Sequence, residues 1–163
     1  MSNMTWKYDE DTGRYIVKGA RILFPNFEGV EQDYNMKGKR NFRLQLDESL
    51  AEEIKSRGIY VRERESRDDT DERQFLMKVG VYNDADIRLL SGRAMTCLSP
   101  ETFKTVDREY KKGHVINGDI DLEFNVSRNT RIASASPYVR LDTMIIPIRK
   151  SRLLEEYEDY DEE

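Results

Sequence analysis

The chain has 163 residues, a mean hydropathy of -0.80 and a charged fraction of 36%. This length suits one domain, and the hydropathy leaves no run long enough to cross a bilayer, so two full lobes and a membrane-spanning protein are excluded. The net charge of -5 is unevenly distributed: residues 155–163 hold seven acidic and no basic residues, which leaves residues 1–154 at +2. The sequence therefore predicts a mildly basic domain with a disordered acidic tail.

The first predicted elements are two strands joined by a basic loop. β-Branched and aromatic residues from Arg14 to Phe24 predict a long strand that Gly19 bends, as the first strand of a small barrel is bent. A turn at 25–29 and a loop at 34–40 with three cations follow. Asn41–Leu46 then alternates, so Phe42 is expected in the core.

A helix and two further strands are predicted next. The helix begins at Asp47 or Ser49, with Ser49 and Glu52 as a capping box, and ends at Gly58. Residues 59–64 and 75–82 each alternate between an apolar face and a face that mixes tyrosine with Arg and Lys. Residues 65–73 hold no apolar residue, which predicts a mobile hairpin loop.

The last predicted elements complete a mainly β fold. A short strand at 87–91 is followed by a helix of about ten residues with Ser99 as N-cap, Pro100 at its first position and Gly113 at its end. Residues 119–126 and 132–148 are the final strands. Six or seven strands with two helices and no βαβ alternation predict an OB-type antiparallel, partly open barrel. We divide the chain into an N-terminal arm (1–13), whose Trp6 and Tyr8 we expect to pack on the barrel, a domain (14–150) and the tail (151–163).

Catalytic and metal-binding patterns are scarce in the chain. A single cysteine, Cys97, and a single histidine, His114, cannot build a Cys/His zinc site, and we expect both to be structural, with Cys97 buried. Asp119, Asp121 and Glu123 share one strand face, which leaves a metal-dependent nuclease as a third hypothesis, although such alternation is more typical of a solvent-facing strand. With no nucleotide-binding or hydrolase motif, we expect neither enzyme activity nor a cofactor or metal.

The faces that mix tyrosine with cations are the main functional signal. Single-stranded nucleic acid is held by bases stacking on aromatic rings and by a cationic groove along the phosphates. The same residue types also occur on strands of proteins that bind no nucleic acid, so a purely solvent-facing role stays open. The candidate residues for binding single-stranded DNA (ssDNA) are Arg21, Tyr34, Lys37, Lys39, Arg40, Arg43, Tyr60, Arg62, Arg64, Lys78 and Tyr82.

One segment also resembles a known family. The run from Ala20 to Gly29 (ARILFPNFEG), followed by Tyr34-Asn35, Gly38 and Arg40-Asn41-Phe42, resembles the opening of ssDNA-binding proteins encoded by tailed bacteriophages. The resemblance implies an OB-type barrel and an acidic C-terminal tail that recruits replication and recombination proteins. The tail here ends in Glu162-Glu163, whereas many such proteins end in an apolar or aromatic residue.

We therefore expect a protein without enzyme activity that coats and protects ssDNA in phage DNA replication or recombination. The tail would recruit protein partners and compete with DNA for the basic surface; its residues are Glu155, Glu156, Tyr157, Glu158, Asp159, Tyr160, Asp161, Glu162 and Glu163. The alternative is a scaffold domain that binds no DNA and whose tail binds a basic protein. Residues 1–8 lack a signal-peptide pattern, which predicts the cytoplasm, that of the host if the chain is phage-encoded, and no membrane partner. Edge strands would permit a homodimer.

Overall fold

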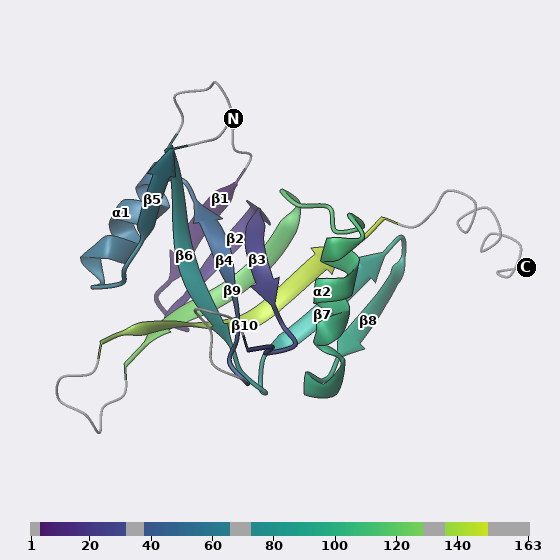
Figure 1. The fold of residues 1–163 in the computed structure, drawn as a ribbon. Helices are drawn as coiled ribbons and strands as arrows, with labels where there is room; N and C mark the ends of the chain where they lie inside the picture. The colour runs from purple at the N-terminus through teal and green to yellow at the C-terminus, as the bar shows by residue number, and fades with distance from the viewer. Residues whose placement is uncertain (1–3, 32–37, 66–72, 129–135, 150–163) are drawn as a thin grey trace, which may run out of the picture.

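The computed structural model describes residues 4–31, 38–65, 73–128 and 136–149, which form one sheet with helices at its margins (Figure 1). The strands are β1 (Thr5–Asp9), β2 (Arg14–Ala20), β3 (Ile22–Asn26), β4 (Arg40–Leu46), β5 (Arg62–Glu65), β6 (Arg73–Val81), β7 (Asp86–Ser91), β8 (Ala94–Leu98), β9 (Ile120–Ser127) and β10 (Tyr138–Pro147). The helices are α1 (Glu48–Ser56), the 3₁₀ turn η1 (Pro100–Thr102) and α2 (Lys104–Lys111). The prediction of a mainly β chain with two helices is confirmed.

The sheet curls into a partly open barrel because one bent stretch of chain supplies both β3, at one end of the sheet, and β2, next to β1 at the other end. β2 and β3 are separated only by Arg21, and the hydrogen-bonded path runs from β2 through β9, β10, β6 and β4 to β3. The β2–β9 register shifts between Val17 and Ala20, where Gly19 has a φ of +70°, a conformation that glycine adopts at least cost. This bulge turns the chain so that β2 pairs with β9 while β3 pairs with β4, as the predicted bend at Gly19 requires.

Two of the strand pairings differ from the antiparallel pattern we predicted. β10 runs parallel to β6, through Arg140 and Gly80, and parallel to β7 over residues 143–147, whereas the other pairings of the described strands are antiparallel. The cause is the turn between β6 and β7, where the Ala85 amide donates to the Tyr82 carbonyl (3.1 Å). This turn displaces the chain without reversing it, so both strands follow β10 in the same direction.

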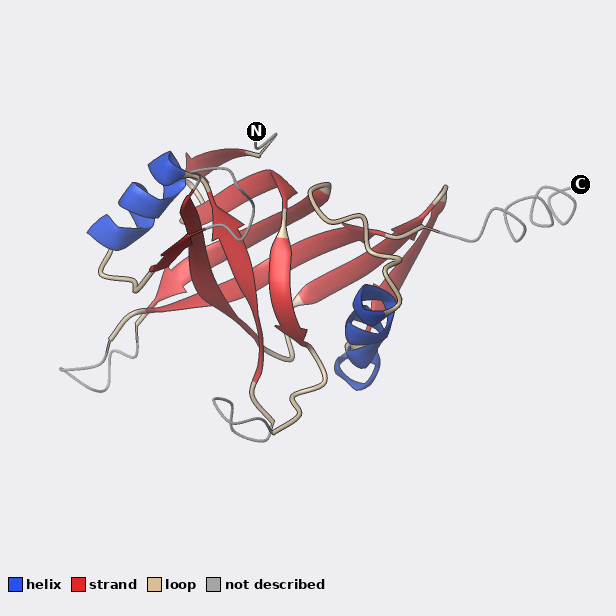
Figure 2. Ribbon diagram, turned by 45° about the horizontal axis from the view of Figure 1, so that its top comes forward, coloured by secondary structure: helices blue, strands red, loops and turns tan. Residues whose placement is uncertain are grey.

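The core fills the inside of the barrel with the alternate residues of its strands. Phe42 is fully buried, as predicted, and stacks on Phe27 with ring centroids 5.4 Å apart. On the other side of the core, Tyr15 stacks on Phe124 at 5.1 Å. Figure 2 shows that α1 and α2 lie at opposite ends of the curled sheet. Neither helix therefore covers the outward faces of the strands that lie between α1 and α2.

The N-terminal segment is ordered against this framework. β1 pairs with β2 along its whole length, and the Trp6 indole Nε1 donates to Ser49 Oγ (3.0 Å) at the start of α1. Trp6 and Tyr8 pack against the core, which confirms the expected packing. Of the two predicted caps for α1, Asp47 is the N-cap, accepting from the Leu50 amide (2.8 Å), while Ser49 donates to Asp47 instead of forming a capping box.

Several local predictions need correction. The strand expected at 59–64 is shorter and begins at Arg62, and the second helix is split into η1 and α2, although Ser99 and Pro100 start it as predicted. Cys97 is exposed, not buried, because the β7–β8 hairpin projects beyond the barrel and leaves residues 94–97 in solvent. The described residues form ten strands instead of the six or seven expected, and most of the loop expected at 65–73 lies outside them. Within the described residues, no helix is long and apolar enough to span a membrane.

Candidate nucleic-acid interface

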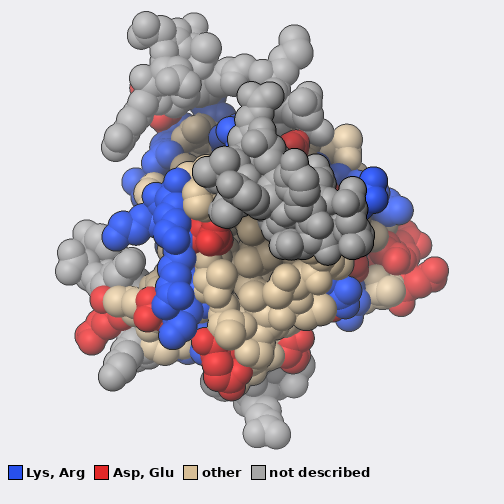
Figure 3. Space-filling model, turned by 90° about the vertical axis from the view of Figure 1, so that its right-hand side faces the viewer, with Lys and Arg blue, Asp and Glu red and all other residues tan. Residues whose placement is uncertain are grey.

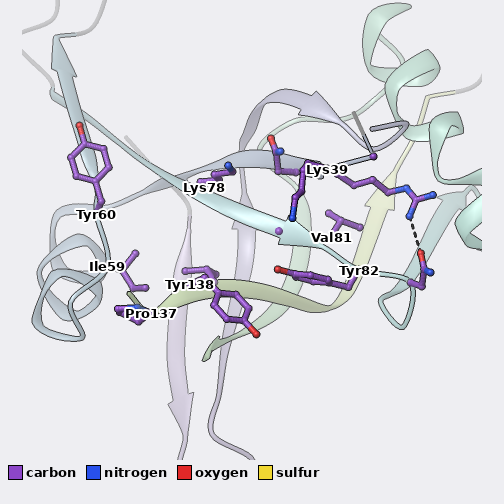
Figure 4. A pocket seen from close by; sticks show the side chains of 14 residues that line it. Lys39, Ile59, Tyr60, Lys78, Val81, Tyr82, Pro137 and Tyr138 are labelled. Carbon is purple, nitrogen blue, oxygen red and sulfur yellow. Dashed lines mark hydrogen bonds between the residues drawn. The ribbon is translucent and has the colours of Figure 1, made fainter. Parts of the chain in front are cut away.

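An open groove with a volume of about 810 Å³ lies across the end of β6. Four segments line it: residues 38–41 at the start of β4, residues 59–60 before β5, the stretch from Lys78 to Asn83, and residues 137–139 at the start of β10 (Figure 4). Five of the predicted ssDNA-binding residues, Lys39, Arg40, Tyr60, Lys78 and Tyr82, are among its lining residues. The fold therefore brings these five predicted residues together from three separate parts of the sequence.

The alternation of β6 places the groove residues on its outward side. Met77, Val79 and Val81 point into the core, so Lys78, Gly80 and Tyr82 face out. A Cβ atom at Gly80 would lie 3.1 Å from Tyr82 Cε2 and 3.4 Å from the Val139 carbonyl oxygen. The missing side chain at Gly80 is what allows the Tyr82 ring to lie against the strand beside the groove.

Two tyrosines form an aromatic pair on one side of the groove. The rings of Tyr82 and Tyr138 are 6.2 Å apart between centroids, tilted by 53°, and 41% and 37% of their surfaces are exposed. The Arg140 guanidinium lies 4.5 Å from the Tyr82 ring centroid and is itself bonded to the Asp84 carboxylate. Burial, and secondarily Tyr138, raises the pKa of Tyr82, so its hydroxyl stays protonated. The pair can offer aromatic surface to a planar ligand.

Four cations form a row that begins at the groove and crosses β4, β6 and β5: Lys39 just before β4, Arg43 on β4, Lys78 on β6 and Arg62 on β5. Arg43 is directly opposite Lys78 in the β4–β6 register. Burial, followed by the charges of Arg43 and Lys39, lowers the pKa of Lys78; burial, followed by the charge of Arg62, lowers the pKa of Arg43. No carboxylate among the described residues forms an ion pair with Arg43, Arg62 or Lys78. The row is therefore a site of mutual repulsion that a polyanion would relieve.

Of three other predicted residues, Arg40 lines the groove but is held by internal contacts, and Arg64 and Arg21 lie outside the groove. Arg40 has internal partners, since its guanidinium donates to Asn83 Oδ1 (2.8 Å) and the Pro100 carbonyl (3.4 Å) and lies over the Phe103 ring, so it ties the groove wall to η1. Arg64 lies over the Phe24 ring at 5.6 Å. Arg21 is exposed but is not among the groove residues; its side chain lies near Gly118. Tyr34, Lys37 and the tail residues Glu155–Glu163 lie outside the described residues.

Sequence reasoning missed three residues of this region: Tyr138, Arg140 and Phe24. Tyr138 and Arg140 show the same alternation of tyrosine and cation that marked β6, but they stand in a run that we predicted only as a final strand. That alternation was the sequence signal by which Tyr138 and Arg140 could have been predicted. Phe24 was counted as a strand-forming residue, yet 58% of its surface is exposed.

The acidic face of β9 has internal partners as well. Asp121 Oδ1 accepts from the Gly19 amide (3.2 Å), and Glu123 Oε2 lies 3.9 Å from the Arg14 guanidinium. Over residues 4–31, 38–65, 73–128 and 136–149, no group of three or more His, Cys, Asp or Glu side chains is arranged to hold a metal ion. The nuclease hypothesis for Asp119, Asp121 and Glu123 thus gains no ligand cluster from the described part of the chain.

A second basic surface lies on the side of the molecule that carries α2 and β8. Figure 3 shows this side, with Lys and Arg gathered in a stripe along one margin and uncharged surface beside it. Helix α2 and its C-terminal turn expose four cations, Lys104, Arg108, Lys111 and Lys112. These cations are not among the residues that line the groove.

Comparisons with known proteins give one family and one set of similar folds. A family model described as a phage ssDNA-binding domain matches residues 4–92, more than half of the chain. Among solved structures, the ssDNA-binding protein from bacteriophage Enc34 in complex with ssDNA is similar with a TM-score of 0.53 at 9% identity, covering 93% of this chain and 98% of that one. The same phage protein as a C-terminal truncation gives a TM-score of 0.50 at 10% identity, covering 91% and 97%. No curated protein matches the chain.

Proposed function

The chain belongs to the phage ssDNA-binding domain family, and from this premise we propose that it binds ssDNA in the groove beside β6. The observation that carries the proposal is the cation row. It consists of positive side chains that repel one another, and three of them lack a carboxylate partner among the described residues. Such an arrangement destabilises the free protein and becomes favourable when phosphates lie along it.

The position of the groove supports the same ligand. OB-type barrels bind oligonucleotides on the face of their second and third strands, between the loop that follows the first strand and the loop that precedes the last. Here those barrel strands are β4 and β6, and the groove is lined by residues 38–41, which precede and begin β4, and 137–139, which begin β10. Groove and cation row thus lie on the surface that this fold uses for nucleic acid.

The groove and the cation row together provide both interactions that hold a single strand. Phosphates would lie along Lys78, Arg43 and Arg62, while bases would stack on Tyr82, Tyr138 and Tyr60, whose side chain is 81% exposed. Stacking of a base on an aromatic ring contributes about 1–3 kcal/mol, and each phosphate contact makes binding weaker as salt rises. Neither interaction reads a base edge, so little sequence preference is expected.

We extend the proposal to the role of the protein in the cell. It coats and protects ssDNA in phage DNA replication or recombination, in the cytoplasm of the host, and catalyses no reaction. The acidic tail, residues 155–163, recruits replication or recombination proteins and acts as a polyanion that competes with DNA for the basic surface. What supports this part is the charge contrast between the tail and the cation row, together with the family.

The test is fluorescence anisotropy with a labelled oligo-dT strand and a matched duplex over a series of salt concentrations. The full chain, a version that stops after Leu154, a Lys78→Gln variant and an Arg14→Gln control are compared. We expect preference for the single strand, weaker binding at high salt, tighter binding without the tail, and a loss in Lys78→Gln that the control does not share. Absence of ssDNA binding by both the full and the truncated chain would refute the proposal and favour the scaffold alternative.

A further inference from the structure

Both the backbone conformation of Phe24 and the exposure of its side chain are unfavourable. Its φ of +50° is the only positive value among the non-glycine residues that the structure describes, and 58% of its surface is exposed. A positive φ brings the Cβ of an L-residue close to the backbone and is uncommon for a bulky side chain. An exposed phenyl ring gains little from burial that would offset this cost. Strain of this kind tends to be kept where a residue binds a ligand.

The chain on both sides of Phe24 enforces this conformation. The β3–β4 register is interrupted between Leu23 and Asn26, so Phe24 and Pro25 form a bulge. Asn26 is buried, and its side chain accepts from the amides of Gly29 (3.1 Å) and Val30 (3.0 Å) and donates to the Val30 carbonyl (2.9 Å). The bulge is therefore fixed from its C-terminal side, and the ring is held outside the core.

The ring also lies next to the cation row. The Arg64 guanidinium is 5.6 Å from the Phe24 ring centroid and is oriented by a hydrogen bond from its Nε to Gln74 Oε1 (2.7 Å). Arg64 is two residues from Arg62 on β5, so both point to the same side of that strand. Leu23, the neighbour of Phe24, is opposite Arg43. The cations thus continue from Lys78 through Arg43 and Arg62 to Arg64 and the exposed ring.

We propose that Phe24 and Arg64 form a second stacking subsite for an unpaired base of the same DNA strand, at the far end of the cation row from the Tyr82–Tyr138 pair. The base stacks on the exposed phenyl ring, and Arg64 and Arg62 bind the adjoining phosphates. This inference rests on the proposed ssDNA-binding function and assigns a residue beyond the groove itself. An apolar segment of a protein partner is the other ligand that could cover the ring, but four neighbouring cations favour a polyanion.

The test compares Phe24→Ala, Phe24→Tyr and a Met95→Ala control, which removes an exposed apolar side chain on β8 away from the groove. Binding is measured with oligo-dT strands of increasing length, and stability by thermal unfolding. We expect Phe24→Ala to lose about 5- to 150-fold in affinity for strands long enough to reach from the groove to Phe24, to bind the shortest strands like the parent, and to unfold at the same or a higher temperature. Phe24→Tyr should retain the affinity.

The outcomes separate this inference from the proposed function. If the parent chain binds long oligo-dT and Phe24→Ala binds every length equally well, the subsite is refuted while ssDNA binding stands. A fall in unfolding temperature that accompanies the loss of affinity at all lengths would indicate a structural role for Phe24 and would also refute it. If the parent chain binds no ssDNA, the proposed function fails first.

Discussion

The two outward faces of the barrel arrange their charged side chains in opposite ways. On the β2–β9–β10 face, Arg14 lies between Glu123 (3.9 Å) and Asp142 (3.5 Å), and Asn125 donates to both oxygens of Asp142. On the β4–β6–β5 face, Arg43 is directly opposite Lys78, and the charge of Arg62, from the other side of β6, also acts on it. On the first face Arg14 is paired with carboxylates, whereas Arg43, Lys78 and Arg62 on the second face have no carboxylate partner among the described residues.

This difference identifies the binding face better than the number of cations does. A paired surface charge contributes little to stability and has no need for a further partner. A row of like charges raises the free energy of the unliganded protein. The lowered pKa values of Arg43, which is partly buried, and of Lys78, which is exposed beside it, have this direction. A row of like charges without carboxylate partners is the arrangement expected where a protein binds an anionic ligand.

The largest expected effect comes from reversing the charge of the row. The double variant Lys78→Glu/Arg43→Glu should lose at least 100-fold in ssDNA affinity near physiological salt, because two phosphate contacts become repulsive. The slope of log affinity against log salt should flatten by about 1.4, given about 0.7 per phosphate on a single strand. Arg14→Gln on the paired face is the matched control and should leave both quantities unchanged; equal losses in the two variants would abolish the contrast between the faces.

The second effect concerns the aromatic pair. Tyr82→Ala should weaken ssDNA binding by about 5- to 150-fold, corresponding to one stacked base, without changing the salt slope. Tyr82→Phe keeps the ring and should bind like the parent. The measurement is anisotropy at two salt concentrations, with circular dichroism to confirm the fold. An equal loss in Tyr82→Phe would mean that the hydroxyl, not the ring, contacts the DNA.

A smaller effect follows from the lowered pKa of Lys78. Burial and its cationic neighbours lower this pKa in the free protein, and a bound phosphate would raise it again. Binding is then linked to proton uptake: affinity is full below the pKa of the free protein and falls as pH rises through it. Between pH 7.5 and pH 10 we expect a loss of a few-fold in the parent and almost none in Lys78→Arg, which stays protonated throughout. A parent curve that is flat up to pH 10 would place Lys78 away from the phosphates.

Much of this interface follows from local sequence patterns. The period-two alternation of residues 41–46 and 75–82 was enough to assign Phe42 to the core and Lys78 and Tyr82 to the outside. The bend at Gly19 was also predictable, because only glycine takes its φ of +70° at low cost. These features depend on residues that are close in sequence.

The remaining features depend on contacts that no local pattern reveals. Tyr138 joins Tyr82 because β10 pairs in parallel with β6, a pairing that arises only when the turn after β6 leaves the chain direction unchanged. In the sequence Arg40 is one of the cations of a basic loop, yet its hydrogen-bond acceptors, Asn83 and the Pro100 carbonyl, come from later parts of the chain. Cys97 stands in an apolar run and is nevertheless exposed, because its hairpin extends past the edge of the barrel. In each case the tertiary structure overrides the local signal.

The smallest effect tests the internally satisfied side of the molecule, where stability and binding should be independent. The buried Tyr15 hydroxyl donates to Glu53 Oε1 (2.9 Å), so Tyr15→Phe should lower the free energy of unfolding by about 1 kcal/mol at pH 7 and leave ssDNA affinity unchanged. Burial, followed by Glu53, raises the pKa of Tyr15 to about 12, above the value near 10 of an unfolded chain. The unfolded state therefore loses this proton more readily, and the parent should lose stability progressively from pH 10 to pH 12, a loss that Tyr15→Phe does not share. Urea unfolding of both proteins at pH 7 and pH 11 measures the difference, and a change in ssDNA affinity in Tyr15→Phe would show that the two faces are coupled through the core.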